Sequence, residues 1–476
     1  MNELLSSISS WLWGWPLIIL LAGTHLILTL RLRIPQRYLL KAIRLSVSKD
    51  PDSKGDVSQF GALAMALSAT IGTGNIIGVG TAIALGGPGA VLWCWITSLL
   101  AIATKYGEAV LAIKYRETTP EGKMLGGPMY ALERGLADNS RGVMRWVWKV
   151  LAIAFAVFTA LATLGIGTSV QSNAIVTALS SASFEINPHI IGGVLVIVAG
   201  AVMLGGVKSI ARVCSALLPF MAVLYVVGCI IILVINGEYM WPTIKLICEA
   251  AIDPAAVGGG FAGGSVLIVA RYGVARGLFS NESGMGSAPI VAAAARTRNP
   301  VRQALVSATG TFWDSVVICA ITGLVIVSSI IAYPDITFED GGELTKMAFS
   351  KIPYIGMPLL TFGLVTFAFS TILGWGYYGE RAIEYLVRKT FKDDNSEQGR
   401  MREIRIYRKI RLIYRIMLLL AVYVGAIMSL NAVWDLADIF NGLMAIPNLL
   451  SLLFLSGVIV KETKKYLWDD NLDGNM

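Results

Sequence analysis

Charged residues are scarce in this chain. Only 15% of its 476 residues are Asp, Glu, Lys or Arg, whereas hydrophobic residues make up 55%. Because soluble domains carry about 25% charged residues, this composition excludes an ordinary soluble protein. The chain instead contains apolar runs of about 20 residues, the length that crosses a bilayer core. We therefore predict an all-α polytopic membrane protein.

Eleven apolar runs follow one another with short loops and no soluble domain between them. The first run has no basic residue ahead of it and no small-residue cleavage site behind it, so we expect a retained span and not a signal peptide. The predicted spans are 11–30, 59–85, 88–113, 147–180, 188–206, 211–235, 255–296, 302–332, 355–386, 408–430 and 433–460.

Histidine, a frequent catalytic and metal-binding residue, is also scarce. The two histidines, His25 and His189, have no partner pattern for catalysis or metal binding, and we expect both to be structural. No HExxH, GxSxG or GxxxxGK[ST] motif is present, which argues against a membrane enzyme and against a nucleotide-driven pump. Cys248 lies in a predicted loop and four cysteines lie in apolar runs, a spacing that fits neither a zinc site nor a disulfide framework.

The basic residues that are present gather in alternate loops. Of the 39 Lys and Arg residues, 33 fall in every second loop, most densely in 380–415. The positive-inside rule makes these loops cytoplasmic, so the amino terminus is predicted outside and the carboxyl terminus inside. The net charge of +8 then reflects membrane orientation. The segment 380–415 is predicted to be a lipid-facing surface, and no nucleic-acid partner is expected.

Glycine is abundant where a span should be most regular. The stretch SATIGTGNIIGVGTAIALGGPGA, residues 68–90, carries seven glycines within an apolar run. Glycine costs about 1 kcal/mol relative to alanine inside a helix, so we predict a helix break at 72–75. A second break is predicted at 279–286, within GLFSNESGMGSAP. Close helix packing through small residues is the alternative for such glycines, and Gly78 and Gly80 fit it well.

Two interrupted spans at corresponding positions indicate a transporter binding site. At each break, the half-helix that starts offers N–H groups to a carboxylate, and the half-helix that stops offers carbonyl oxygens to a cation. Five spans separate the breaks, so the second half must be inverted. We predict repeats at 59–235 and 236–461, preceded by a first helix with a basic cytoplasmic linker (1–58) and followed by a cytoplasmic tail (462–476).

Two sequence stretches carry a family resemblance. GTGNIIGVGTAIALGGPGAVLWCWITSLLAIATKYGEAVLAIKYR and RYGVARGLFSNESGMGSAPIVAAAA resemble the sodium:alanine (alanine/glycine:cation) symporter family. The family pattern Phe-Trp-Met-Trp after GGPGA is here Leu92, Trp93, Cys94 and Trp95, an apolar change. The resemblance implies a leucine-transporter-type (LeuT-type) 5+5 inverted repeat of the APC superfamily. It also implies Na⁺-coupled uptake of alanine or glycine through a bacterial or archaeal plasma membrane.

The resemblance also implies a binding site. Thr73, Gly74 and Asn75 would meet the substrate carboxylate, and residues from Phe279 to Gly284 would wall the pocket and offer carbonyls to the amino group. The remaining implied substrate residues are Gln171, Thr371 and Trp375, of which Trp375 would restrict the side chain to the size of a methyl group.

The implied Na⁺ site combines carbonyls of the first break with hydroxyls of a later span. The carbonyls are those of Ser68 and Ile71, and the hydroxyls are those of Ser370 and Thr371. Neutral oxygens of this kind suit a hard cation. Hydroxyls bonded back to the preceding helical turn are the alternative.

Ionisable residues within spans suggest function. Asp314 would hold a second cation, the substrate ammonium or a neighbouring arginine, and Glu282 would hold the ammonium or cap a half-helix. Lys105 and Glu108, three residues apart, are expected to form a structural pair. The segment Arg271–Arg276 carries two arginines that either line the access path or reach to the surface.

An ion channel is the competing class, although two broken helices within a ten-span repeat favour alternating access. Within the transporter class, proton coupling through Asp314 or Glu282 is the runner-up. The sequence leaves open the choice between alanine and glycine, the enantiomer, the stoichiometry and the oligomeric state.

Overall fold

The computed structural model describes residues 2–48, 50, 53–119, 121–181, 186–253, 265–336, 341–390, 397–428 and 431–474. In these ranges the regular elements are helices, apart from one antiparallel hairpin of β1 (Glu117–Thr118) and β2 (Met124–Leu125). Eight helices are long and apolar enough to cross a membrane, or nine if one bent pair counts as a single span. The protein is therefore a multi-pass membrane protein.

The helices of the first half are α1 (Asn2–Leu12), α2 (Trp15–Arg31), η1 (Pro35–Tyr38), α3 (Leu39–Ser46), α4 (Gln59–Thr70), α5 (Thr73–Gly86), α6 (Ala90–Lys114), α7 (Pro128–Tyr130), η2 (Ala131–Ala137), α8 (Gly142–Leu164), η3 (Gly165–Ser169), α9 (Val170–Ser181), α10 (Pro188–Leu204) and α11 (Gly206–Ile235). The second half contains η4 (Gly237–Tyr239), α12 (Met240–Ile252), α13 (Val266–Asn281), α14 (Ala288–Ala292), α15 (Pro300–Thr311), η5 (Phe312–Cys319), α16 (Ala320–Ala332), α17 (Gly341–Ser350), α18 (Gly356–Thr390), α19 (Glu397–Ile427), α20 (Asn431–Phe454), α21 (Ser456–Thr463) and η6 (Lys464–Trp468).

Each predicted apolar run contains a helix or a chain of helices, because a backbone in lipid must satisfy its own hydrogen bonds. The run 188–206 forms α10, which has 17 residues, and part of the run 255–296 lies outside the described residues. Several stretches that the hydropathy left between spans are helical as well, α3 and η2 among them. Others form α12, which carries Cys248, and α17.

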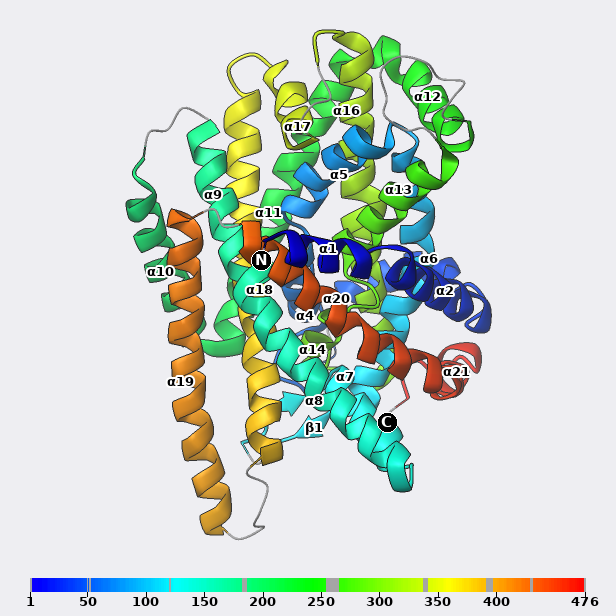
Figure 1. The fold of residues 1–476 in the computed structure, drawn as a ribbon. Helices are drawn as coiled ribbons and strands as arrows, with labels where there is room; N and C mark the ends of the chain where they lie inside the picture. Colours follow the sequence, from blue (N-terminus) through cyan, green and yellow to red (C-terminus); the bar gives the residue numbers. More distant parts are fainter. Residues whose placement is uncertain are drawn as a thin grey trace.

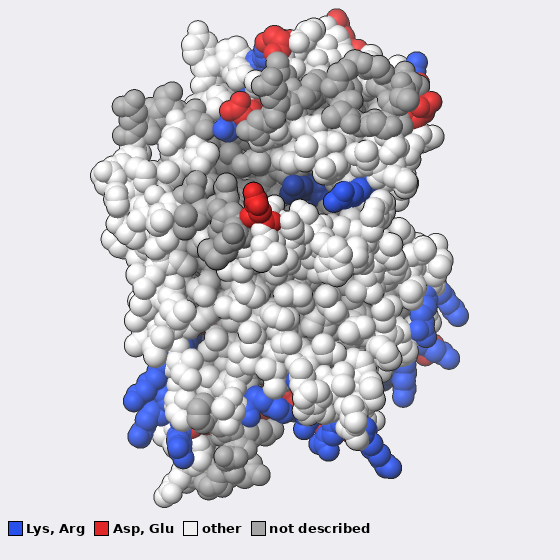
Figure 2. Space-filling view, in the orientation of Figure 1, with Lys and Arg blue, Asp and Glu red and all other residues white. Residues whose placement is uncertain are grey.

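The two broken spans run in opposite directions. In Figure 1, α4 lies below α5, whereas α13 lies above α14, and both breaks fall near the middle of the bundle. Figure 2 shows Lys and Arg side chains gathered at the end that carries the hairpin and the lower ends of α8, α18 and α19, with acidic side chains at the other end. We refer to these as the basic end and the opposite end.

The basic end contains contacts between segments that are distant in sequence. Arg298 donates to Asp50 over 2.6 Å, and Arg302 donates to Asp473 over 2.8 Å. Asn299 donates from its side chain to the carbonyls of Leu472 and Gly474. The tail, the segment before α4 and the start of α15 are thereby joined at the basic end.

Candidate functional site

The first break is short. Helix α4 ends at Thr70, α5 begins at Thr73, and the two are bent by 42°. Ile71 is extended, with ψ of 106°, and the N–H of Gly72 donates to the Asn75 side-chain oxygen over 2.9 Å. Thr73 and Asn75 therefore belong to the first turn of α5. The Asn75 N–H donates to the Gly72 carbonyl over 3.3 Å, whereas the N–H groups of Thr73 and Gly74 have no acceptor within the helix and are available to an anion.

The second break begins later than predicted. Phe279 still lies in α13, and the irregular segment is 282–287, compared with the predicted 279–286. Glu282, Gly284 and Gly286 have φ values of 52°, 93° and 85°. Two of these left-handed positions carry glycine because glycine alone adopts them without strain, which explains the SGMG sequence at this point.

Glu108 differs from its predicted role. No ion pair joins Lys105 to Glu108 in the described part of the chain. Instead, a Glu108 oxygen accepts the N–H groups of Gly284 and Gly286, each over 3.0 Å, and the Asn448 amide over 2.7 Å. The predicted ion pair is wrong because the N–H groups freed by the break and the Asn448 amide bind one Glu108 oxygen, whereas Lys105 Nζ and the other Glu108 oxygen have no hydrogen-bond partner among the described residues. Glu108 thus fixes the second break to α6 and α20.

Three of the four residues of the implied Na⁺ site, Ser68, Ser370 and Thr371, come together. The Ser68 carbonyl lies 3.2 Å from the Ser370 hydroxyl and 3.1 Å from the Thr371 hydroxyl. Both hydroxyls also lie within 3.0 Å of the Phe367 carbonyl, so the back-bonded alternative is present too. Close contact of α18 with α4 makes this possible, because a side chain at Gly374 would clash with Ala69.

A small cavity of about 30 Å³ lies between the two breaks. Seven predicted site residues line it, and Asn75 and Gly284 do not. Ser280, which lies in the predicted wall segment from Phe279 to Gly284, also lines the cavity, as do Ile166 and Asn441, which were not predicted. The predicted residues around the cavity are Thr73, Gly74, Gln171, Phe279, Glu282, Thr371 and Trp375.

Asn75 and Asp314 form a fully buried connection behind this cavity. The Asn75 amide donates to an Asp314 carboxylate oxygen over 2.9 Å and to Ser280 over 2.8 Å. Ser280 and Ser315 donate to the other carboxylate oxygen. Among the described residues Asp314 has no ion pair, so none of the described arginines neutralises it. This carboxylate joins α5, α13 and η5 through neutral donors only.

Two buried oxygen atoms at the cavity have no hydrogen-bond partner. They are Oε1 of Gln171 and Oδ1 of Asn441, whose side chains are 5% and 2% exposed. A buried polar atom without a partner costs free energy, so each is suited to receive a donor from a ligand. Asn441 was missed, although a polar amide within an apolar run was a signal in the sequence.

A vestibule of about 660 Å³ connects the cavity with the opposite end. Five residues line both spaces: Thr73, Gly74, Ile166, Gln171 and Phe279. They form the floor of the vestibule and the mouth of the cavity. Of the two alternatives for the arginines, lining the access path or reaching to the surface, Arg276 follows the first, because it lines the vestibule. The Arg271 guanidinium lies 5.8 Å from the ring of Tyr272. In Figure 2 a hollow with a few charged side chains lies in the upper half of the face.

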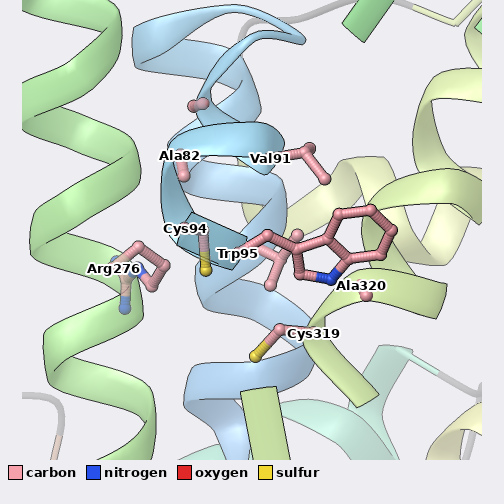
Figure 3. A pocket seen from close by; sticks show the side chains of 9 residues that line it. Ala82, Val91, Cys94, Trp95, Arg276, Cys319 and Ala320 are labelled. Carbon is pink, nitrogen blue, oxygen red and sulfur yellow. The ribbon is translucent and has the colours of Figure 1, made fainter. Parts of the chain in front are cut away.

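A second pocket, of about 10 Å³, lies beside Arg276 (Figure 3). Cys94 and Trp95 of α6 face Cys319 and Ala320 across it. This volume holds about one water molecule, so the pocket is too small for an organic substrate. Its wall is mostly apolar.

The two histidines are bonded to hydroxyls, His25 to Thr104 and His189 to Tyr423, as expected of structural residues.

Comparison with known proteins identifies the family. The model of the sodium:alanine symporter family matches residues 1–475. The chain belongs to this family. It is 47% identical over 468 residues to the sodium/alanine symporter of Methanococcus maripaludis, covering 98% of this chain and 97% of that protein. An amino-acid carrier protein of Bacillus subtilis is 33% identical, with 98% and 92% covered.

The fold agrees with a solved structure. The crystal structure of MhsT in complex with L-phenylalanine matches 86% of this chain and 98% of its own, with a TM-score of 0.50 and 16% sequence identity. This supports the leucine-transporter-type fold. The chain is accordingly a sodium-coupled symporter by family and not an enzyme.

Proposed function

We propose that this symporter carries a small neutral amino acid, alanine or glycine, together with Na⁺ into the cell. The observation that supports this most directly is the single cavity between the breaks. One wall presents the N–H groups of the first turn of α5, and another presents the unpartnered oxygens of Gln171 and Asn441. These groups are complementary to the carboxylate and the ammonium of a zwitterion.

The two charges of the substrate are assigned to different groups in the cavity wall. The carboxylate is placed at Thr73 and Gly74, where the helix dipole favours an anion. The ammonium is placed at Gln171 and Asn441, with Glu282 as a nearby carboxylate. Asn75 and Gly284 act indirectly in this proposal, Asn75 by capping the N–H of Gly72 and Gly284 by bonding to Glu108.

The size limit is attributed to Trp375. It is 1% exposed and lies against Gly167, where a side chain would clash with the indole. Phe279 and Ile166 close the remaining sides. A buried indole held in this way leaves space for hydrogen or methyl beside the substrate Cα. This favours glycine and alanine over larger amino acids.

The coupling Na⁺ is placed at the Ser68 and Ile71 carbonyls and the Ser370 and Thr371 hydroxyls. All four ligands would be neutral oxygens, which suit Na⁺. The site joins α4 to α18, so bound Na⁺ would hold the first broken span against its neighbour and stabilise the cavity beside it.

The membrane orientation follows from the charge distribution. We place the basic end in the cytoplasm and the amino terminus outside, in a bacterial or archaeal plasma membrane. The vestibule then opens to the outside while the network of Asp50, Arg298, Arg302 and Asp473 closes the inside. This corresponds to the outward-facing state of an alternating-access cycle.

Proton coupling remains the second candidate, and Asp314 is the observation that favours it. A fully buried carboxylate with neutral donors only can be occupied either by a second cation or by a proton. Glu282, which accepts a hydrogen bond from Ser287 and lines the cavity, is the other carboxylate that would carry it.

Uptake of radiolabelled alanine into proteoliposomes tests the proposal. An inward Na⁺ gradient should drive uptake, and an equal K⁺ gradient at the same pH should not. Unlabelled glycine should compete, whereas phenylalanine should not. Uptake that needs a proton gradient and ignores Na⁺ would replace this proposal by proton coupling, and absence of alanine uptake under every gradient would reject the substrate.

A further inference from the structure

The segment before the ten-span repeat reaches the mouth of the cavity. Trp13, between α1 and α2, lines the vestibule together with Ser9 and Ser10. Its ring lies edge-on to Phe279, with centroids 5.5 Å apart and planes at 63°. Phe279 is one of the five residues shared by vestibule and cavity. Trp13 therefore contacts the aromatic residue that lies between the vestibule and the cavity.

Trp13 is fixed by a second helix. Its indole N–H donates to the Asp438 carbonyl of α20 over 3.0 Å. Gly442, one turn further along α20, lets the segment approach, since a side chain there would lie 2.7 Å from Leu12 and 3.4 Å from the indole nitrogen. The indole thus bridges α20 and α13, which lie on different sides of the vestibule.

Phe279 also has a charged neighbour. The Arg276 guanidinium lies 5.4 Å from the centre of the Phe279 ring. Arg276 and Asp438 both line the vestibule, so the aromatic pair lies at a point where α13 and α20 carry opposite charges. An inward movement of α20 toward α13 would press the indole further over Phe279.

We propose that Trp13 is a positioning residue of the outer gate, which holds Phe279 across the mouth of the cavity and slows the escape of a bound amino acid into the vestibule. The identity of that ligand rests on the proposed function, whereas the gate itself does not. Aromatic edge-to-face pairs of this geometry contribute enough to change a rate several-fold.

The first test compares Trp13→Ala with Trp11→Ala, a control two residues earlier in the chain, at the end of α1, that is 69% exposed. In detergent with saturating Na⁺, labelled alanine should dissociate about three- to tenfold faster from Trp13→Ala and at the wild-type rate from Trp11→Ala. Trp13→Phe, which keeps an aromatic ring but loses the N–H, should fall between. Equal dissociation rates for wild type, Trp13→Ala and Trp13→Phe would overturn the proposal.

The second test needs no substrate. Cys248 is the exposed member of the five cysteines, so Cys248→Ser provides the background for a reporter cysteine at Ile166, in the mouth of the cavity. A membrane-impermeant thiol reagent should label Ile166→Cys several-fold faster when Trp13→Ala is added. Unchanged labelling would reject the gate. Faster labelling, together with a wild-type protein that neither binds nor transports alanine, would reject the proposed substrate and retain the gate.

Discussion

At the scale of single residues, the site depends on oxygen atoms whose partners lie far away in sequence. Ser68 and Thr371 are 303 positions apart, yet the carbonyl of one lies 3.1 Å from the hydroxyl of the other. The adjacent Ser370–Thr371 hydroxyls were a signal in the sequence. The contact itself needs Gly374 against Ala69, which brings the two helix backbones together.

Removal of the Thr371 hydroxyl should weaken Na⁺ binding. Thr371→Val keeps the branched shape and loses one proposed ligand, so the Na⁺ concentration for half-maximal alanine uptake should rise about tenfold. Uptake measured over a Na⁺ series in proteoliposomes checks this. Thr366→Val is the matched control, because that hydroxyl donates to the Phe362 carbonyl on the same helix. An unchanged Na⁺ dependence in Thr371→Val would place the ion elsewhere.

At the scale of elements, the second break depends on a carboxylate from another helix. Helix α14 has only five residues, too few for stability on its own. Glu108 of α6 accepts the N–H groups of Gly284 and Gly286, and Asn448 of α20 bonds to both Glu108 and the Gly284 carbonyl. These bonds replace the helical hydrogen bonds that the break removes.

Loss of this carboxylate should destabilise the protein more than loss of its charge alone. Glu108→Ala leaves two buried N–H groups without an acceptor and should cost about 2–3 kcal/mol of stability. Glu108→Gln retains one acceptor oxygen and should cost less. The order of stability is checked by heating the purified variants and measuring the fraction that stays folded by size-exclusion chromatography. If the alanine variant melts at the wild-type temperature, Glu108 does not support the break.

At the scale of the whole molecule, the vestibule lies toward the opposite end, and a network of contacts lies at the basic end. The contacts at the basic end join the residues before α4, the start of α15 and the carboxyl-terminal tail. Asp50 contributes most directly, since its side chain is 1% exposed and bonds to Arg298. A buried ion pair that loses one partner is strongly weakened.

Weakening this network should shift the population away from the outward-facing state. In the Ile166→Cys, Cys248→Ser background, Asp50→Asn should slow labelling from the vestibule about threefold, a shift of about 0.7 kcal/mol between the two states. Lys41→Gln is the control, because Lys41 and Asp470 form an exposed pair at the same end. Labelling of Asp50→Asn at the wild-type rate would show that these contacts do not hold the basic end closed.

The sequence by itself determined the class of the protein, the helical state of its apolar runs and the approximate position of its first break, which was predicted at 72–75 and lies at 71–72. Apolar runs and glycine clusters act locally, through the cost of exposing backbone groups to lipid and the conformational freedom of glycine. Seven of the proposed site residues were also named from sequence and surround one cavity. Their roles, and the repeat boundaries at 59–235 and 236–461, stay predictions.

Only the tertiary structure decided which polar groups meet. Spacing suggested a pair of Lys105 and Glu108, but Glu108 serves the second break because folding brings unsatisfied N–H groups to it. Asn75 was expected to face the substrate and is instead buried against Asp314. Trp13 lies before the predicted repeats and still reaches Phe279. Hydrogen-bond partners are set by three-dimensional proximity, which no periodicity within one span encodes.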